Sequence, residues 1–94
     1  MNEVLAGRLS GDRVRLGPEA LAELYEQGYF GRPKGTGLEL SLVEAAYLLD
    51  RSRIWVLDGE SEMDFPSFFQ AASSLEKGFE FRFVVYKDLR ERGY

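Results

Sequence analysis

The pattern of apolar and polar residues predicts short β-strands in four stretches of the chain. Residues 4–9 and 13–16 form the first two, and the intervening Ser10-Gly11-Asp12 is a turn sequence that favours a hairpin. Residues 38–40 alternate between apolar and polar, and residues 54–57 are a compact apolar run. The pattern therefore predicts about four short strands, of which the first two are adjacent and antiparallel.

The segments between these strands have the spacing of helices. Gly17-Pro18 and Gly28 bound a first helix, because proline is favoured in the first turn and glycine just after the last one. Ser41 and Glu44 have the spacing of a capping box, in which each residue satisfies the backbone N–H of the other. We therefore expect a second helix from there to about Asp50.

The carboxy-terminal part of the chain predicts further helix, over about residues 64–77 and 79–92. Gly78 between these segments either separates two helices or only weakens one long helix. Together with the strands, this predicts an α+β fold with about three or four helices packed on a small, mostly antiparallel sheet of about four short strands.

The last helical segment carries more apolar surface than one neighbour can cover. One stripe consists of Phe79, Phe83 and Tyr86, and an adjoining stripe consists of Phe81, Val85 and Leu89. An ordinary surface helix buries an arc of roughly 100°, and the two stripes together exceed it. We predict that one stripe packs on this domain and that the other is a domain or subunit interface. The cations Lys87, Arg90 and Arg92 near the end of this helix are predicted to form a solvated face.

Composition and charge narrow the function classes. The 94 residues predict one domain, and 45% hydrophobic and 30% charged residues are typical of a folded protein. The net charge of −4 argues against a general RNA-binding surface, because counterion release from a basic patch supplies most of that affinity. No apolar run approaches the roughly 20 residues that span a bilayer, so no membrane contact and a cytoplasmic location are expected.

The sequence contains neither histidine nor cysteine. Serine triads, thiol nucleophiles and thiolate metal sites are therefore excluded in their usual forms, and we expect no catalytic residue, metal ligand or cofactor. Asp58, Glu60, Glu62 and Asp64 are open to two interpretations, a metal or acid–base site and a solvated acidic turn that caps the next helix. The glycine and terminal glutamate of a calcium loop are missing, which favours the second.

A loop over residues 31–37 carries the cations Arg32 and Lys34 between glycines. It matches neither the dinucleotide fingerprint nor the P-loop pattern. Two interpretations stay open, a connecting loop and a positively charged loop that contacts RNA phosphate or an acidic partner surface. Tyr29 and Phe30 beside it either pack against the domain, which we favour, or stack on a base.

Three segments resemble the archaeal tRNA-intron endonucleases. Residues 24–33, LYEQGYFGRP, resemble the family block LYE-x-GYYGRP, and residues 38–49, LELSLVEAAYLL, resemble LELSL-x-EA-x-YLL. Residues 85–94, VYKDLRERGY, are similar to the helix that leads into the catalytic domain in that family. The three blocks occur in order and at family-like spacing, so the resemblance covers nearly the whole chain.

The resemblance implies a substrate and a mechanism. Enzymes of the family cut precursor tRNA at both ends of an intron, recognise a bulge–helix–bulge shape, and leave a 2′,3′-cyclic phosphate and a 5′-hydroxyl. A tyrosine, a histidine and a lysine of the carboxy-terminal domain act without a metal. This chain lacks the histidine, and Lys34, Tyr86, Lys87 and Tyr94 are not at the positions of the active-site motif. No catalytic residue is therefore carried over.

On this interpretation, residues 1–78 are an amino-terminal, non-catalytic domain, and residues 79–94 are a helix leading into a catalytic domain that this chain does not contain. The chain is then a structural part of a tRNA-splicing endonuclease and is inactive alone. Its expected partners are a catalytic domain or subunit, precursor tRNA through the assembled enzyme, and further copies in an oligomer. The alternative is a stand-alone protein-interaction module that uses its apolar last helix.

Overall fold

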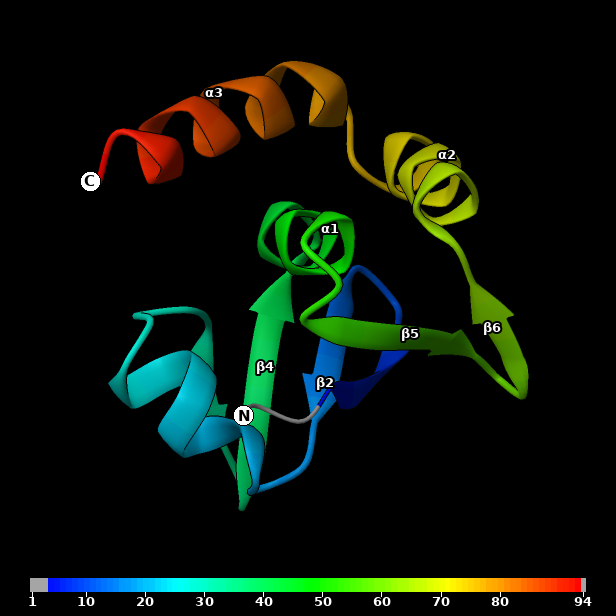
Figure 1. Ribbon diagram of the computed structural model, residues 1–94. Coiled ribbons are helices and arrows are strands. Elements are labelled where there is room, and N and C mark those ends of the chain that lie inside the picture. Colours follow the sequence, from blue (N-terminus) through cyan, green and yellow to red (C-terminus); the bar gives the residue numbers. More distant parts are fainter. Residues whose placement is uncertain (1–3, 94) are drawn as a thin grey trace.

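Residues 4–93 are described by the computed structural model, which has an α+β fold as predicted (Figure 1). Its strands are β1 (Leu5–Ser10), β2 (Arg13–Leu16), β3 (Arg32–Lys34), β4 (Gly37–Ser41), β5 (Ile54–Asp58) and β6 (Ser61–Met63). Its helices are the π-helix η1 (Leu21–Glu26) and the α-helices α1 (Leu42–Asp50), α2 (Phe65–Leu75) and α3 (Phe79–Glu91).

The strands form one sheet in the order β3-β4-β2-β1-β5-β6. Strands β1 and β5 run parallel, and each other neighbouring pair in the described residues is antiparallel. The predicted hairpin is confirmed as β1–β2, in which Leu9 pairs with Val14. The mostly antiparallel character of the sheet is also as predicted.

Within residues 4–93 the sheet has six strands rather than the predicted four or so, and the two additional strands are β3 and β6. Each is three residues long, one in the segment that the sequence assigned to a loop and the other in the acidic run. Neither carries the alternating apolar residues of a half-buried strand. Backbone hydrogen bonds to a longer neighbour define both, as the pairs Arg32–Glu39 and Leu57–Glu62 illustrate.

One face of the sheet packs on α1, and α2 and α3 lie on the far side of α1 (Figure 1). The sheet contributes Val14, Leu40 and Val56 to the core, while α2 and α3 contribute Phe68 and Phe79. Burying side chains of this size stabilises the fold by roughly 1.5–3 kcal/mol each. Because successive strand residues point to opposite faces, the other face of the sheet is directed away from α1.

At one helix end a prediction is confirmed, and at another an open alternative is decided. Ser41 Oγ accepts a hydrogen bond from the Glu44 N–H at 3.3 Å, and Glu44 Oε1 accepts one from the Ser41 N–H at 2.9 Å, which completes the capping box of α1. Gly78 has φ of +78°, a conformation that favours glycine, and it separates α2 from α3. The structure therefore has two helices in this region.

The first helix differs from the expectation. Gly17-Pro18 forms a turn, and η1 begins only at Leu21. Leu24 of η1 is fully buried, and its carbonyl oxygen accepts a hydrogen bond from the Phe30 N–H at 2.7 Å. This hydrogen bond turns the chain back against the end of the π-helix, a geometry that apolar spacing alone does not predict.

Candidate interaction surfaces

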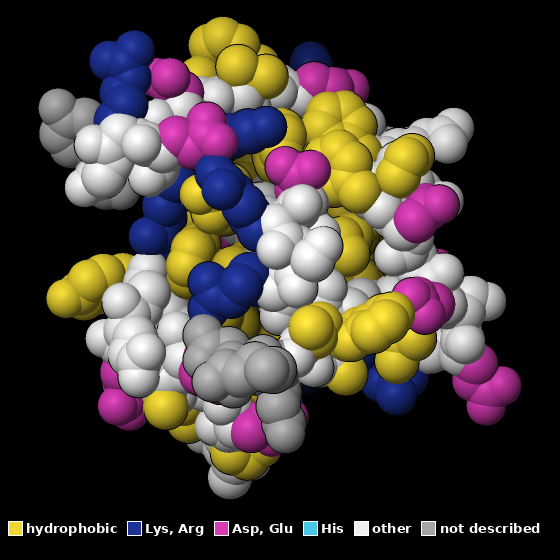
Figure 2. Space-filling view, viewed as in Figure 1, with side chains coloured by type: hydrophobic (Ala, Val, Ile, Leu, Met, Phe, Trp, Pro, Cys, Tyr) yellow, Lys and Arg dark blue, Asp and Glu magenta, His cyan; other side chains and the backbone are white. Residues whose placement is uncertain are grey.

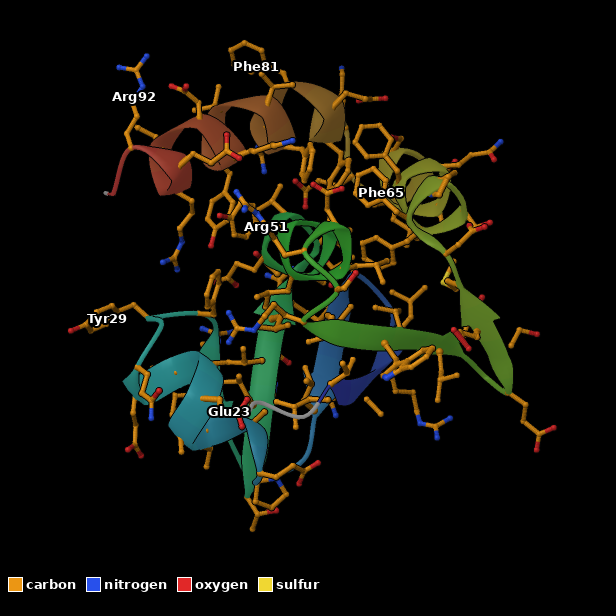
Figure 3. The ribbon with its side chains drawn as sticks, in the orientation of Figure 1. Glu23, Tyr29, Arg51, Phe65, Phe81 and Arg92 are labelled. Carbon is orange, nitrogen blue, oxygen red and sulfur yellow. The ribbon has the colours of Figure 1, made fainter. Side chains whose placement is uncertain are left out.

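The outer side of α3 is apolar and exposed. Phe81 is 74% exposed, Val84 64%, Val85 41% and Leu89 44%. In Figure 3, Phe81 points away from the rest of the domain. Phe81, Val85 and Leu89 are the stripe that the sequence separated from the inward-facing one, and Val84 extends it. We call these four residues the apolar stripe.

A groove of about 660 Å³ lies between α2 and α3 beside the apolar stripe. Phe65, Phe69 and Phe83 line it, with ring centroids 5.5–5.7 Å apart, and Val84 belongs to both the groove and the stripe. Aromatic rings at this separation pack favourably on one another. Together, the groove and the stripe offer a continuous apolar surface with a preformed aromatic floor.

Arg32 and Lys34 lie on β3, where both reach the carboxylate of Glu39 on β4. Arg32 Nη2 is 3.3 Å from Glu39 Oε1, and Lys34 Nζ is 3.5 Å from Oε2. Arg15 Nε on β2 approaches the same Oε2 at 3.7 Å. Glu39 is only 4% exposed, whereas each of the three cations is more than half exposed. A buried carboxylate thus lies beneath three exposed cations.

The charge state of Glu39 follows from these neighbours. Desolvation by burial raises the pKa of this carboxyl, but the hydrogen bond from Arg32 and the charge of Lys34 outweigh it. The net effect holds the pKa of Glu39 below its ordinary value of 4.5, so the group is ionised at neutral pH.

The strand register continues this row of charge across the sheet. Arg32 pairs with Glu39, Glu39 with Arg15, and Arg15 with Arg8. Directly paired residues point to the same face, so these four side chains share the face turned away from α1. We call Arg8, Arg15, Arg32 and Lys34 the basic sheet face. The sequence reasoning found Arg32 and Lys34 but missed the other two.

A signal for the missed cations was present in the chain. In β2, Arg15 lies between Val14 and Leu16, which are both buried, so the alternation directs the guanidinium outward. Arg8 follows the same alternation in β1, where it is exposed and donates a hydrogen bond to the Gly59 carbonyl oxygen at 2.9 Å.

Other cations gather where α3 meets the end of α1 and the loop before β3. We call Arg51, Lys87 and Arg90, with their partners, the α3–loop junction. Figure 2 shows Lys and Arg side chains along this side of the molecule. Arg90 lies over the ring of Phe30 at 3.8 Å and donates hydrogen bonds to the Gly28 and Tyr29 carbonyl oxygens at 2.8 and 3.0 Å. Its Nε also donates to Tyr86 Oη at 3.1 Å. The prediction of a solvated Arg90 is therefore wrong.

The two aromatic residues of this loop have different environments. Phe30 is buried and stacks near Tyr47, which agrees with the packing that we favoured. Tyr29 is 81% exposed and has φ of +60°, a backbone conformation that costs a non-glycine residue roughly 1–2 kcal/mol. The hydrogen bond from Arg90 to the Tyr29 carbonyl oxygen helps to hold that conformation.

The acidic run is distributed over a hairpin and a helix cap. Asp58 ends β5, Glu62 lies in β6, and Asp64 Oδ1 accepts a hydrogen bond from the Ser67 N–H at 2.9 Å at the start of α2. Hydrogen bonding from Ser67 lowers the pKa of Asp64. Residues 4–93 contain no group of three His, Cys, Asp or Glu side chains placed to hold a metal ion. In the same residues, no helix has the length and hydrophobicity to cross a membrane.

The structure is thus a small α+β domain with two exposed surfaces, one apolar and one basic. Residues 5–69 match the family model of the tRNA intron endonuclease, N-terminal domain, and the chain belongs to this family. The resemblance found in the sequence is confirmed.

Curated relatives extend the match beyond those residues. The chain is 55% identical over 92 residues to a tRNA-splicing endonuclease of Methanosarcina mazei, which covers 97% of this chain and 26% of that protein. It is 44% identical over 95 residues to the tRNA-splicing endonucleases of Thermococcus onnurineus and Pyrococcus furiosus, covering 100% of this chain and 56% of each relative. The chain thus spans from about a quarter to about half the length of the curated relatives it matches.

Proposed function

We propose that this chain is a non-catalytic, structural module of a tRNA-splicing endonuclease and that its apolar stripe docks the part of the enzyme that cleaves RNA. The observation that carries the proposal is the exposure of Phe81, Val84, Val85 and Leu89 on the outer side of α3. The occupant follows from the relatives, since the matched residues form only 56% of the Pyrococcus furiosus protein. The remainder of such an endonuclease is the partner that we assign to this surface.

Energetics support a docking role for this surface. Four large apolar side chains that are 41–74% exposed lose much of that exposure when a partner covers them. At about 25 cal/mol per Å², the gain is on the order of 5 kcal/mol before the cost of association. The groove beside the stripe supplies a depression into which a partner side chain fits.

The division of chemistry between the parts supports the same role. Cleavage of RNA at a ribose without a metal requires a base for the 2′-hydroxyl and an acid for the leaving oxygen. The sequence carries no histidine to serve in either role near neutral pH. We therefore assign proton transfer to the partner, with no cofactor in this chain and with precursor tRNA bound by the assembled, cytoplasmic enzyme.

The domain boundary is part of this proposal. Residues 1–78 form the structural domain, and residues 79–94 connect it to the catalytic part. Since the inner side of α3 contributes Phe79 and Phe83 to this core, α3 packs on both bodies at once. A helix shared in this way fixes the orientation of the catalytic part, and assembly of further copies builds on the same arrangement.

A chimera tests the proposal. This chain replaces the matched residues of the Pyrococcus furiosus endonuclease, and cleavage of a bulge–helix–bulge precursor tRNA is measured beside that of the 94-residue chain alone. We expect the chimera to cleave and the chain alone to be inactive. The variant Phe81→Ser/Val85→Ser should reduce cleavage by the chimera at least about tenfold, a loss of about 1.4 kcal/mol in coupling.

The matched control is Tyr25→Ser on η1, a large side chain that is 39% exposed but lies outside the apolar stripe. We expect it to leave cleavage unchanged. Cleavage by the 94 residues alone would overturn the non-catalytic role. Full activity of the stripe variant, or an inactive unmodified chimera, would overturn docking and favour the stand-alone interaction module.

A further inference from the structure

The chain carries a net charge of −4, yet its open sheet face is positively charged. Arg8, Arg15, Arg32 and Lys34 lie there around the carboxylate of Glu39. Arg13, two residues from Arg15 in β2, shares this face and is paired with Asp12 at 3.4 Å. Toward β6, the next carboxylate of this face is Glu62, which lies beyond Leu57 at the β6 edge.

Glu44 borders this face in a pocket with Arg13 and Arg32, and its carboxylate accepts hydrogen bonds from the Gly31 and Ser41 N–H groups. Around Glu39, five cations therefore face the three carboxylates of Glu39, Asp12 and Glu44, which leaves a surplus of positive charge on this face although the whole chain is acidic.

Glu39 holds the cations together but engages only some of their N–H donors. An arginine has five N–H donors, and Arg15 and Arg32 each approach Glu39 with one nitrogen, at 3.7 and 3.3 Å. The carboxylate is 4% exposed, so it lies below the plane of the cations, which are 55–70% exposed. The remaining donors are free to bind the oxygens of a phosphate from above.

The spacing of the row suits a polyanion. Arg32, Glu39, Arg15 and Arg8 occupy successive strands, which lie about 4.8 Å apart, so the row extends over roughly 14 Å. That length accommodates several phosphates of one nucleic acid strand. A single small anion would engage only a fraction of these cations.

An exposed indole completes this face. Trp55 of β5 pairs with Ala6, and Ala6 lies two residues from Arg8 in β1, so Trp55 points to the same face as the cations. Its side chain is 47% exposed, which is unusual for the one tryptophan of a small domain. Glu62 and Asp64 line a pocket with Trp55, so the indole lies where the cationic row meets the acidic β6 edge. An accessible indole at the end of a cationic row favours a nucleic acid with accessible bases over an acidic peptide, because bases stack on aromatic rings.

We infer that the basic sheet face and Trp55 bind a single-stranded segment of RNA, with the cations on its phosphates and the indole stacked on a base. The inference rests on the proposed function for the choice of RNA over DNA and for the identity of that RNA as precursor tRNA. The two surfaces are independent in space. The basic face is directed away from α1, whereas α3 and the apolar stripe lie on the far side of α1 (Figure 1).

RNA titration of the 94-residue chain tests the inference. A fluorescein-labelled, unstructured RNA of about 12 nucleotides is titrated by anisotropy between about 50 and 200 mM salt. Each phosphate contact contributes about −0.7 to the slope of log K against log salt for a single strand. We expect Arg32→Ala/Lys34→Ala to reduce the steepness by about 1.4 and to weaken binding at low salt about tenfold or more.

Trp55 provides an independent signal, because it is the one tryptophan of the chain. We expect its fluorescence to be quenched as the RNA saturates the protein. Trp55→Ala should weaken binding between about 5-fold and 150-fold, the range for loss of one stacked base, and should leave the salt slope unchanged. A stacking loss without a slope change separates this role from that of the cations.

The matched control is Lys77→Ala/Arg82→Ala, which removes two exposed cations from the other side of the molecule. It should change neither affinity nor slope, and circular dichroism verifies that each variant is folded. An equal loss in the control, or the absence of binding at about 50 mM salt, would overturn the inference. Competition by polyglutamate as strong as by RNA, without quenching of Trp55, would also overturn it and favour an acidic protein.

Failure of this inference is distinguishable from failure of the proposed function. Phe81→Ser/Val85→Ser should leave RNA binding by the 94-residue chain intact, because those residues lie on the opposite layer. If the chimera requires the apolar stripe while the chain does not bind RNA, docking stands and only the RNA contact is wrong.

Discussion

The α3–loop junction and the basic sheet face both gather cations, but they engage them differently. At the junction, Arg51 Nη2 lies 2.6 Å from Glu91 Oε2, and Lys87 Nζ lies 3.6 Å from Asp50 Oδ2. Arg90 donates three hydrogen bonds to carbonyl and hydroxyl oxygens of the same chain. On the sheet, three cations share the one carboxylate of Glu39.

This difference distinguishes cations that stabilise the fold from cations that are available to bind a ligand. A cation whose donors are taken by the fold stabilises the fold, and its removal leaves acceptors without partners. A cation in surplus gains little from the fold and repels its neighbours, so its donors remain available to a ligand. The number of cations in a cluster is therefore less informative than their internal partners.

The largest expected effect is the loss of Arg90 at the junction. Arg90→Ala removes the cation over Phe30 and the donor to the Gly28, Tyr29 and Tyr86 oxygens. We expect the free energy of unfolding to fall by about 2–3 kcal/mol, measured by urea denaturation. The matched control is Arg92→Ala, whose exposed partner Asp88 lies on the same helix, with an expected change within about 0.5 kcal/mol. A loss below about 1 kcal/mol for Arg90→Ala would show that the junction cations are as dispensable as those of the sheet.

A smaller effect is expected from Glu39 on the basic sheet face, and it depends on pH. The folded state lowers the pKa of Glu39, so its carboxylate contributes stability above the ordinary value of 4.5 that is lost as pH falls through the lower folded value. Glu39→Gln should remove this acid-side decline and lower stability at neutral pH, because three cations then repel one another without an anion.

The RNA affinity of the Glu39→Gln variant provides a second comparison of the sheet face with the junction. If the surplus charge of the sheet face binds phosphate, Glu39→Gln should tighten RNA binding while it weakens the fold. The control is Glu62→Gln at the β6 edge, which should lower the free energy of unfolding at neutral pH far less, because Glu62 is exposed. A Glu39→Gln protein that loses both stability and RNA affinity would mean that Glu39 does not restrain the charge of this face.

Local signals made part of this architecture predictable. The capping box at Ser41 and Glu44 depends on two residues three apart, and the outward side of α3 follows from the helical spacing of Phe81, Val85 and Leu89. Such features are fixed by neighbours in the chain, so the sequence alone indicates them.

Features that depend on distant partners were not predictable in this way. Strand β3 exists because β4 pairs with it, and the charged row across Glu39, Arg15 and Arg8 requires the strand order β3-β4-β2-β1. Arg90 was expected in solvent because cations are common near the end of a helix, whereas its acceptor at Gly28 lies 62 residues earlier. The alternation of residues in β2 did indicate that Arg15 points outward, but it could not indicate which residues of the adjacent strands lie beside it.

The smallest expected effect tests the ion pair that closes the junction at its solvent edge. Arg51 and Glu91 are each 45% exposed, and Arg51 also lies over the Tyr47 ring at 5.0 Å. A double-mutant cycle with Arg51→Ala and Glu91→Ala should give a coupling of about 0.5 kcal/mol by urea denaturation, because solvent screens exposed pairs. The coupling should diminish at about 1 M salt, where the screening length is only about 3 Å. A coupling above about 2 kcal/mol that persists in salt would show that this pair, rather than Arg90, stabilises the junction. The junction would then differ from the sheet face in its ion pairs and not in its hydrogen bonds to the backbone.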